Sequence, residues 1–408
     1  MKNDLGGRFG FMDNLAIFGG KPVRENKISY GRQLIEDDDI AAVVETLKSP
    51  YLTCGPKITE LEDKLCEITG AKHAVAVSNG TAALHIACMA IGIQPGDEVI
   101  VSSITFAASS NCVLYCGGTP VFADIRPDTY NIDVEDVKRK ITDKTKAIVA
   151  VDFTGQAVEL DELKKICKEH NLFLIEDAAH SIGTKYKGQP VGSIADITTF
   201  SFHPVKTVTA GEGGACMTNS DELYKKLALA RTHGITKHPE EMVRESEGPW
   251  YYEQVDLGYN YRITDFQAAL LLSQLKKLER FSNRRKEIRR MYDAAFSEMP
   301  ELFVQKQIPE SDTTQHLYII RLNSEKLKCT RREFFDAFAA EGFGPQVHYV
   351  PVYRHPYYEK LGYKKGLCPV AEATYEQIIS IPFYPALTDK DVEDTITAIK
   401  KIVDYYRK

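Results

Sequence analysis

The fold is decided by the stretch "KAIVAVDFTGQAVELDELKKICKEHNLFLIEDAA", residues 146–179. Two short apolar runs, 146–153 and 172–179, flank a segment at 161–171 whose apolar residues recur at helical spacing. Continuous apolar runs joined by an amphipathic helix predict parallel strands in a sheet that is covered on both faces. This unit therefore indicates an α/β fold.

Further apolar runs of the same kind extend the predicted sheet on both sides of this unit. They occupy residues 73–78, 98–103, 119–125, 197–202 and 214–218. The last two are too close together for a crossover helix, so we expect them to be antiparallel. The sequence thus predicts a mainly parallel seven-stranded sheet sandwiched by helices, with ligands bound beyond the carboxyl ends of the strands.

The pattern changes after a long helical segment that begins near Thr264. Beyond it we expect strands at 316–322 and 345–352, a helix at 331–341 and a terminal helix from residue 389 onward. A chain of 408 residues is also long enough for more than one core. We therefore predict an N-terminal extension at 1–27, a large domain at 28–265 and a smaller α+β domain at 266–408.

Composition narrows the classes of function. The net charge of −6 and the pI of about 6.0 are not those of a nucleic-acid-binding protein. No apolar run approaches the ~18 residues of a membrane span, and the first residues do not resemble a secretory signal. The nine cysteines lack zinc-site spacing, so no metal site is predicted, and reduced buried thiols favour a cytoplasmic location.

The segment "SNGTAAL", residues 78–84, follows the first predicted strand and begins a helix. Ser78 or Asn79 can cap this helix, and Gly80 lets a ligand approach the backbone. Free N–H groups and the helix dipole make such a turn a candidate phosphate site. A well-capped helix without a ligand remains an alternative from this motif alone.

Two carboxylates, Glu176 and Asp177, end the strand at 172–179. Neighbouring residues of a strand point to opposite faces, so these two cannot form a catalytic pair. A buried carboxylate needs a cationic or hydrogen-bond-donating partner, and a ligand with a protonated ring nitrogen would be one. Capping of the next turn is an equally good interpretation in isolation.

Lys206 follows the strand at 197–202, whose end carries Ser201. A lysine in such a loop is ordinarily solvated. Here it shares the sheet edge with the candidate phosphate turn and with Asp177. A phosphate cradle, a carboxylate for a pyridinium nitrogen and an amine for a Schiff base are the groups that pyridoxal phosphate (PLP) requires.

The motifs "SNGTAAL", "ITFAASSN", "IEDAAHSIG", "FSFHPVK", "GEGG" and "GYNYRITDFQAAL" resemble those of a known family. They are similar to the fold-type I, PLP-dependent nucleotide-sugar aminotransferases of the DegT/DnrJ/EryC1/StrS group. The resemblance extends from about Ile28 to the C-terminus.

The resemblance implies a role for each matching residue. Lys206 would form the Schiff base with the cofactor and move the proton, Asp177 would pair with the pyridinium nitrogen, and His180 would contact the phenolic oxygen of the ring. The remaining implied cofactor contacts are Gly80, Thr81 and Ser201 at the phosphate, Phe106 stacked on the ring, and Asn260 reaching the cofactor of a neighbouring subunit. Asn260 in this role requires a homodimer with shared active sites.

Segments such as "LTCGPKI", "GPWYYEQVDLGYNYR" and "QVHYVPVYRHPYYEKLGY" resemble the branch of the family that acts in pseudaminic acid biosynthesis. That branch transfers an amino group from L-glutamate to C4 of a UDP-4-keto-6-deoxy-N-acetyl-hexosamine. His348 and Tyr349 would then shape the sugar site, although they could equally belong to a strand of the small domain. The turn "NGTAAL" differs from the "SATSAL" common in this branch, so another UDP- or dTDP-sugar remains an alternative.

Two other classes of function stay open on this fold. Related sugar dehydratases replace the Schiff-base lysine with histidine, and Lys206 argues against that class. A regulator that binds the cofactor without turnover is the other alternative.

Overall fold

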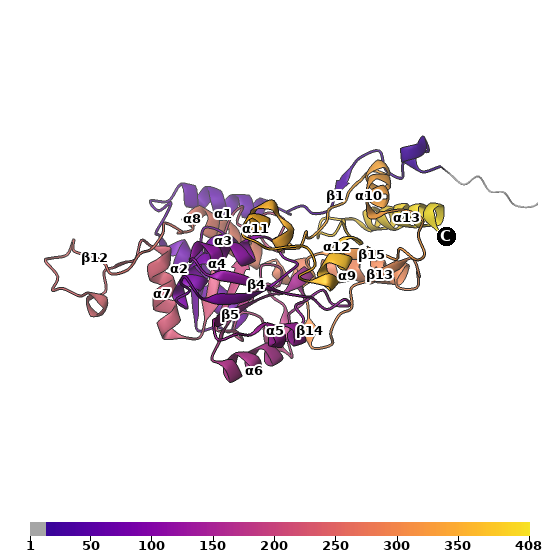
Figure 1. The fold of residues 1–408 in the computed structure, drawn as a ribbon. Coiled ribbons are helices and arrows are strands. Elements are labelled where there is room, and N and C mark those ends of the chain that lie inside the picture. Colours follow the sequence, from indigo (N-terminus) through magenta and orange to yellow (C-terminus); the bar gives the residue numbers. More distant parts are fainter. Residues whose placement is uncertain (1–13) are drawn as a thin grey trace, which may run out of the picture.

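The computed structural model describes residues 14–408. Figure 1 shows a large layered unit beside a smaller one that contains the C-terminus. Residues 1–13 of the predicted N-terminal extension lie outside the described part of the chain.

The large unit is built around a seven-stranded sheet with the order β2-β10-β9-β6-β5-β3-β4. Strand β10 is antiparallel to both of its neighbours, β2 and β9, and the other pairs are parallel. The strands are β2 (His73–Val77), β3 (Glu98–Ser102), β4 (Thr119–Ala123), β5 (Thr145–Val151), β6 (Phe173–Asp177), β9 (Ile197–Ser201) and β10 (Gly214–Thr218). The predicted α/β class, the seven strands and the antiparallel last pair are confirmed.

Helices cover both faces of this sheet because its strands are apolar on both faces. One face packs against α2 (Pro56–Thr69), α5 (Val134–Lys140), α6 (Leu160–His170) and α8 (Asp265–Leu275). The other face packs against α3 (Gly80–Ala90), α4 (Ala108–Tyr115) and α7 (Asp221–Arg231). Helix α1 (Asp37–Leu47) lies against α8.

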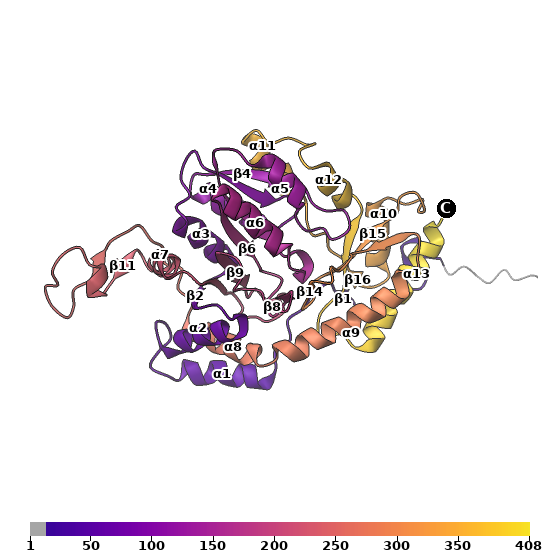
Figure 2. The same ribbon diagram turned by 90° about the horizontal axis from the view of Figure 1, so that it is seen from below.

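The predicted long helical segment is two helices, α8 and α9 (Leu278–Phe296). Thr264 caps α8 in a capping box with Gln267, as expected for a helix that starts there. Helix α9 then runs from the large unit into the smaller one, where Ile288 and Phe296 are buried in its core (Figure 2). The two units are therefore joined by a packed helix.

The smaller unit contains an antiparallel sheet of β13 (Leu302–Val304), β15 (Tyr318–Leu322) and β17 (Ile378–Ile381). Its core contains residues of α10 (Arg331–Ala340) and α13 (Asp389–Tyr406). Helices α11 (Pro356–Lys360) and α12 (Pro369–Tyr375) pack against the large unit, where Tyr358 and Ala371 share a cluster with Phe122 of β4. The expected strand at 316–322 and the helices at 331–341 and from 389 onward are present within a few residues.

The expected strand at 345–352 is wrong. This segment is irregular apart from one bridge between Gln346 and Ser380, and it ends in a short helical turn at Val352–Arg354. Pro345 and Pro351 lack the N–H groups that a strand needs for its ladder. Strand β17 takes the place beside β15 instead.

The N-terminal residues pack on the smaller unit. Leu15 and Ile28 are buried in its core, and β1 (Ile28–Ser29) pairs with β16 (Phe343–Gly344). The buried carboxylate of Glu341 accepts hydrogen bonds from the N–H groups of Ala16 and Val23. The predicted domain boundaries stay a prediction, but residues near the N-terminus contribute to the C-terminal core.

Two smaller strand groups complete the described chain. Strands β7 (Lys185–Tyr186), β8 (Gln189–Pro190) and β14 (Ser311–Asp312) form one of them. The other is a hairpin of β11 (Ile235–Thr236) and β12 (Glu253–Gln254), which stands out from the body of the molecule in both views (Figures 1 and 2). We call residues 233–258 the arm.

The described residues can be searched for membrane-spanning helices, metal-binding clusters and disulfides. Within residues 14–408 no helix is long and apolar enough to cross a membrane. The same residues hold no group of three or more side chains arranged to bind a metal ion. All nine cysteines are free thiols, and six of them are buried, whereas Cys54 is exposed.

Candidate active site

A cavity of about 720 Å³ lies at the carboxyl ends of β2, β3, β5, β6 and β9. This is the edge at which an open parallel sheet binds its ligands. Nine of the ten predicted site residues line it: Gly80, Thr81, Phe106, Asp177, His180, Ser201, Lys206, His348 and Tyr349. Segments far apart in the sequence are thus brought to one site, as expected.

The turn before α3 has the form of an anion cradle. Asn79 is the residue that caps the helix, because its side chain accepts a hydrogen bond of 2.8 Å from the N–H of Ala82. A Cβ atom on Gly80 would lie 2.8 Å from Cβ of Ser201, so only glycine fits between the turn and β9. The first N–H groups of α3 and the Ser201 hydroxyl therefore border the same end of the cavity.

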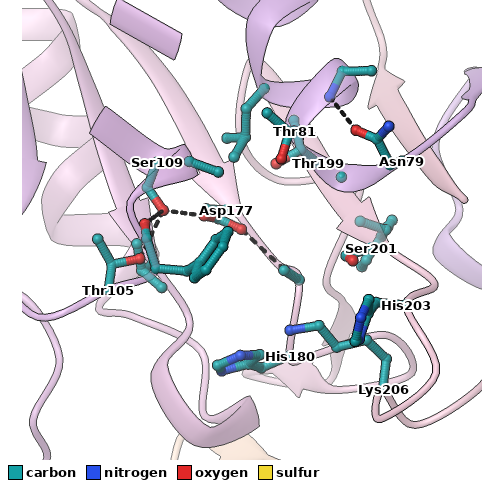
Figure 3. A pocket seen from close by; sticks show the side chains of 18 of the residues that line it. Asn79, Thr81, Thr105, Ser109, Asp177, His180, Thr199, Ser201, His203 and Lys206 are labelled. Atoms are coloured by element: carbon teal, nitrogen blue, oxygen red, sulfur yellow. Dashed lines mark hydrogen bonds between the residues drawn. The ribbon is translucent and has the colours of Figure 1, made fainter. Parts of the chain in front are cut away.

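Asp177 lies at the end of β6 with its carboxylate in the cavity (Figure 3). One carboxylate oxygen accepts a hydrogen bond of 2.6 Å from the Ser109 hydroxyl, and the other accepts one of 3.2 Å from the N–H of Ala179. Burial raises the pKa of this carboxyl above its ordinary value, although these donors and Lys206 oppose the shift. A protonated ring nitrogen would supply the positive charge that this buried group lacks.

Thr105 and Ser109 are functional candidates that the sequence reasoning did not single out. Their hydroxyl oxygens lie 2.7 Å apart, and Ser109 in turn donates to Asp177. Both belong to the segment "ITFAASSN", from which only Phe106 was predicted. The motif could therefore have indicated Thr105 and Ser109 as site residues. The hydrogen bond from Ser109 to Asp177 of β6 depends on the tertiary fold and could not be predicted.

Lys206 extends from the loop after β9, and its amine faces the same open space as Asp177 and His180 (Figure 3). Burial lowers the pKa of this amine to about 8, while the charge of Asp177 opposes the shift. An amine with such a pKa is partly neutral near pH 7, as a nucleophilic lysine must be.

His180 is buried, and its Nδ1 atom has no hydrogen-bond partner among the described residues. Burial lowers the pKa of its imidazole well below the ordinary value, and Lys206 and His348 add to the shift. Its ring lies 4.3 Å from the ring of His316, a contact that was not predicted. A neutral imidazole with an unused ring nitrogen can bind a ligand oxygen.

His348 and Tyr349 line the cavity on the side of the smaller unit. Nδ1 of His348 lies 2.8 Å from the Ser380 hydroxyl, and burial lowers the pKa of the imidazole to about 4. The ring of Tyr349 lies 6.3 Å from that of Phe106, which is itself 62% exposed. The same wall includes Tyr30, whose ring is 5.0 Å from that of His348.

Asn260 is the one predicted site residue that lies outside the cavity. It is exposed at the base of the arm, and its backbone pairs with that of Thr232. This position agrees with the implied contact of Asn260 with the cofactor of a neighbouring subunit rather than with that of its own chain.

Fold and cavity together define a PLP-type transferase site, and comparison with known proteins agrees. Residues 33–400 match the model of the DegT/DnrJ/EryC1/StrS aminotransferase family. The chain belongs to this family.

Two relatives are similar over nearly their whole length. The spore coat polysaccharide biosynthesis protein SpsC of Bacillus subtilis is 41% identical over 93% of this chain and 98% of its own. A UDP-4-amino-4,6-dideoxy-N-acetyl-beta-L-altrosamine transaminase of Campylobacter jejuni is 39% identical over 91% of this chain and 97% of its own.

Solved structures give the same result. Helicobacter pylori PseC, an aminotransferase of pseudaminic acid biosynthesis, has a TM-score of 0.87 and 32% identity over 93% of this chain and 100% of its own. The sugar aminotransferase Spr1654 of Streptococcus pneumoniae, solved in its PLP form, has a TM-score of 0.86 and 32% identity. The similarity covers 93% of this chain and 99% of that one. The protein is thus a fold-type I sugar aminotransferase that uses PLP, and the cradle at Gly80, the Asp177 carboxylate and the Lys206 amine fit that cofactor.

Proposed function

We propose that the protein transfers the amino group of L-glutamate to C4 of a UDP-4-keto-6-deoxy-N-acetyl-hexosamine. The product would be UDP-4-amino-4,6-dideoxy-N-acetyl-β-L-altrosamine, an intermediate of pseudaminic acid biosynthesis. The observation that carries this proposal is the similarity of nearly the whole chain to the Campylobacter jejuni transaminase, supported by one cavity that nine of the ten proposed site residues line.

Lys206 is the proposed catalytic residue. Bound PLP supplies an electron sink for the carbanion formed at the substrate carbon. The Lys206 amine anchors the cofactor aldehyde and, once released, moves a proton at the substrate carbon. Its lowered pKa keeps part of the amine neutral near physiological pH, which both steps require.

Asp177 and His180 would hold the cofactor ring from one edge. The Asp177 carboxylate, oriented by Ser109, is the proposed partner of the protonated ring nitrogen. His180 has a free ring nitrogen for the phenolic oxygen. Phe106 would stack on the ring, and Gly80, Thr81 and Ser201 would bind the phosphate.

His348 and Tyr349 are proposed to shape the sugar side of the site. They line the cavity together with the proposed cofactor-binding residues, and His348 contacts Ser380 of the smaller unit's sheet. Their irregular backbone, which forms no regular strand, supports a binding role over a purely structural one.

A different sugar is the second candidate. SpsC is slightly more similar to this chain than the altrosamine transaminase is, at 41% against 39% identity. The name of SpsC gives no sugar, so its similarity leaves the substrate open, and the alternative products are a UDP-4-amino-4,6-dideoxy-N-acetylglucosamine or a dTDP-amino sugar.

The deciding experiment offers the purified enzyme UDP- and dTDP-linked 4-keto and 3-keto sugars with L-glutamate. NMR of each product fixes the carbon that carries nitrogen and its configuration. Preferred amination of the altrosamine precursor at C4 supports the proposal, whereas preference for another sugar assigns that one instead.

The half-reaction with glutamate distinguishes an enzyme from a regulator that only binds PLP. A transaminase forms one equivalent of 2-oxoglutarate per site from glutamate without any sugar. A PLP-binding regulator would form none. The dehydratase alternative is opposed by Lys206 itself, because the related dehydratases carry a histidine in its place.

We also propose that the protein acts as a homodimer with shared sites. The exposed position of Asn260 and the projecting arm support this arrangement. The nine free cysteines favour a reducing compartment, and the cytoplasmic location stays a prediction.

A further inference from the structure

Two buried carboxyl groups lie behind the active site, on the far face of the sheet from the cavity. Asp152 follows β5 and Glu176 lies in β6, and both residues are fully buried. The strand register pairs Ala150 with Glu176 and Val151 with Asp177. Because side chains alternate between faces, Asp152 and Glu176 share one face and Asp177 points to the other.

The two carboxyl groups differ in how many of their oxygens accept hydrogen bonds. Both oxygens of Asp152 are occupied, one by the Ser181 hydroxyl at 2.5 Å and one by the N–H of Val158 at 3.0 Å. Glu176 accepts a hydrogen bond only from the Thr198 hydroxyl, at 2.8 Å, and its other oxygen, Oε1, accepts none from any donor of the described residues. An ionised Glu176 would thus bury an unsatisfied, charged oxygen.

Among residues 14–408, no lysine, arginine or histidine is a main influence on the charge of either carboxyl group. The charged groups that act on them are each other and Asp177. Burial followed by the charge of Asp152 raises the pKa of Glu176 well above its ordinary value, and burial raises that of Asp152 to about 7. Two carboxyl groups in such a site cannot both be ionised.

We propose that Glu176 is held as a neutral acid that donates its proton to Asp152, and that this pair positions the loop carrying His180. The Asp152 carboxylate binds Ser181, which directly follows His180 in the chain. The N–H of Asp152 also donates to the carbonyl of Asp177 at 3.1 Å. The pair therefore holds both cofactor-facing residues, Asp177 and His180, from behind the sheet.

A shared proton makes stability depend on pH in a definite direction. The pKa of Glu176 in the folded protein is raised above the ~4.3 of the unfolded chain. The contribution of Glu176 to the free energy of unfolding is therefore complete below pH ~4.3 and is lost as the pH rises through the pKa of the folded protein. Loss of the proton would also leave two adjacent negative charges behind Asp177.

The direct test is infrared spectroscopy of the protein without cofactor at pH 7. We expect an absorption of a protonated carboxylic acid that disappears in Glu176→Gln. Glu372→Gln is the matched control, because Glu372 is buried and accepts hydrogen bonds from Tyr353 and the N–H of Gly366 in a different part of the molecule. Absence of the band in the unmodified protein, or its persistence in Glu176→Gln, would overturn the proposal.

The positioning role is tested by PLP affinity and by the pH dependence of thermal stability. Glutamine keeps a donor and an acceptor, so Glu176→Gln should retain the Kd for PLP within about twofold and remove the loss of Tm at alkaline pH. Ser181→Ala and Glu176→Leu should each raise the Kd for PLP about tenfold, because each removes a hydrogen bond of the network that holds the loop with His180. An unchanged Kd in Ser181→Ala, measured on protein shown to be folded, would contradict the positioning role.

Discussion

The chemistry of single residues in this site depends on how far each is removed from water. Asp177 and Lys206 are two potential charges in one cavity, and burial moves their pKa values toward the neutral forms. His180 and His348 are kept neutral by the same burial and by the nearby amine. Both shifts show that the site without cofactor holds charge at a cost, which a ligand carrying a phosphate and a protonated ring nitrogen would offset.

Replacing the catalytic amine tests the assignment at the residue scale. Lys206→Ala should lower amino transfer by at least about 10⁴-fold, because no other amine of the cavity can replace it. Turnover with L-glutamate and the keto sugar is the measurement, and circular dichroism checks the fold. Retained transamination in a folded variant would exclude Lys206 as the cofactor-binding lysine.

The lowered pKa of Lys206 also predicts a pH effect on stability. The folded pKa of about 8 lies below that of the unfolded chain, so unfolding takes up a proton between pH 8 and the ordinary lysine pKa of ~10.4. The contribution of Lys206 to the free energy of unfolding is therefore lowest below pH 8 and rises as the pH increases from 8 toward ~10.4. The facing groups are Asp177, His180 and His348.

Lys206→Met removes this dependence. We expect the variant without cofactor to have a higher Tm than the unmodified protein at pH 7, with the difference shrinking toward pH 10. Calorimetry across this range is the measurement. A difference in Tm that stays constant with pH would show that the folded pKa of Lys206 is not lowered.

At the scale of elements, the strand ends decide which side chains meet. Alternation along β6 separates Asp177 in the cavity from Glu176 behind the sheet, and both have a threonine of β9 as the paired residue. The pairing of β10 with both β2 and β9 brings Gly80, at the start of α3, against Ser201 at the end of β9. Catalytic geometry here is a consequence of sheet register.

The sequence was sufficient for the strands and for most of the cavity, because buried parallel strands are apolar runs and because the site motifs follow them directly. Prediction from the sequence was wrong for a segment that has no periodic pattern of its own. Residues 345–352 are apolar enough for a strand, but their prolines and their position against the cavity prevent one. Contacts such as that of His180 with His316 join segments whose proximity only the tertiary fold determines.

Gly80→Ala tests the cradle. The new Cβ would lie 2.8 Å from Cβ of Ser201 and must displace either the turn or β9, so the Kd for PLP should rise about tenfold or more. Gly31→Ala is the control, because its Cβ would meet only Val205 at an ordinary 3.6 Å. Equal PLP affinities of the two variants would show that the close approach at Gly80 is not needed for phosphate binding.

At the scale of the whole molecule, the arm is the feature that a single chain does not explain. It stands away from the body (Figures 1 and 2), and its exposed apolar residues include Val243, Trp250 and Leu257 at 84%, 72% and 67% exposure. Asn260 lies at its base, outside the cavity of its own chain. If the arm packs against a second copy of the chain, this apolar surface is covered. Asn260 of one chain then lies near the cofactor site of the other.

Trp250 is the only tryptophan of the chain and so reports on the arm directly. If the arm packs on a second copy, its fluorescence should shift to the blue in the assembled protein and return to the red on dilution to monomers. Light scattering provides the oligomeric state over the same concentrations. A red-shifted emission that does not change while the protein is dimeric would show that Trp250 lies outside the interface.

Complementation distinguishes shared from separate sites. Asn260→Ala alone should weaken PLP binding, and Lys206→Ala alone should be inactive. In a mixed dimer with shared sites, both defects fall in one site and the other site is intact. Random mixing should then restore about a quarter of the normal activity, since half of the dimers are mixed and each has one intact site of two. If each chain instead completes its own site, every site of the mixture carries one defect, and mixing would restore nothing beyond the residual activity of Asn260→Ala.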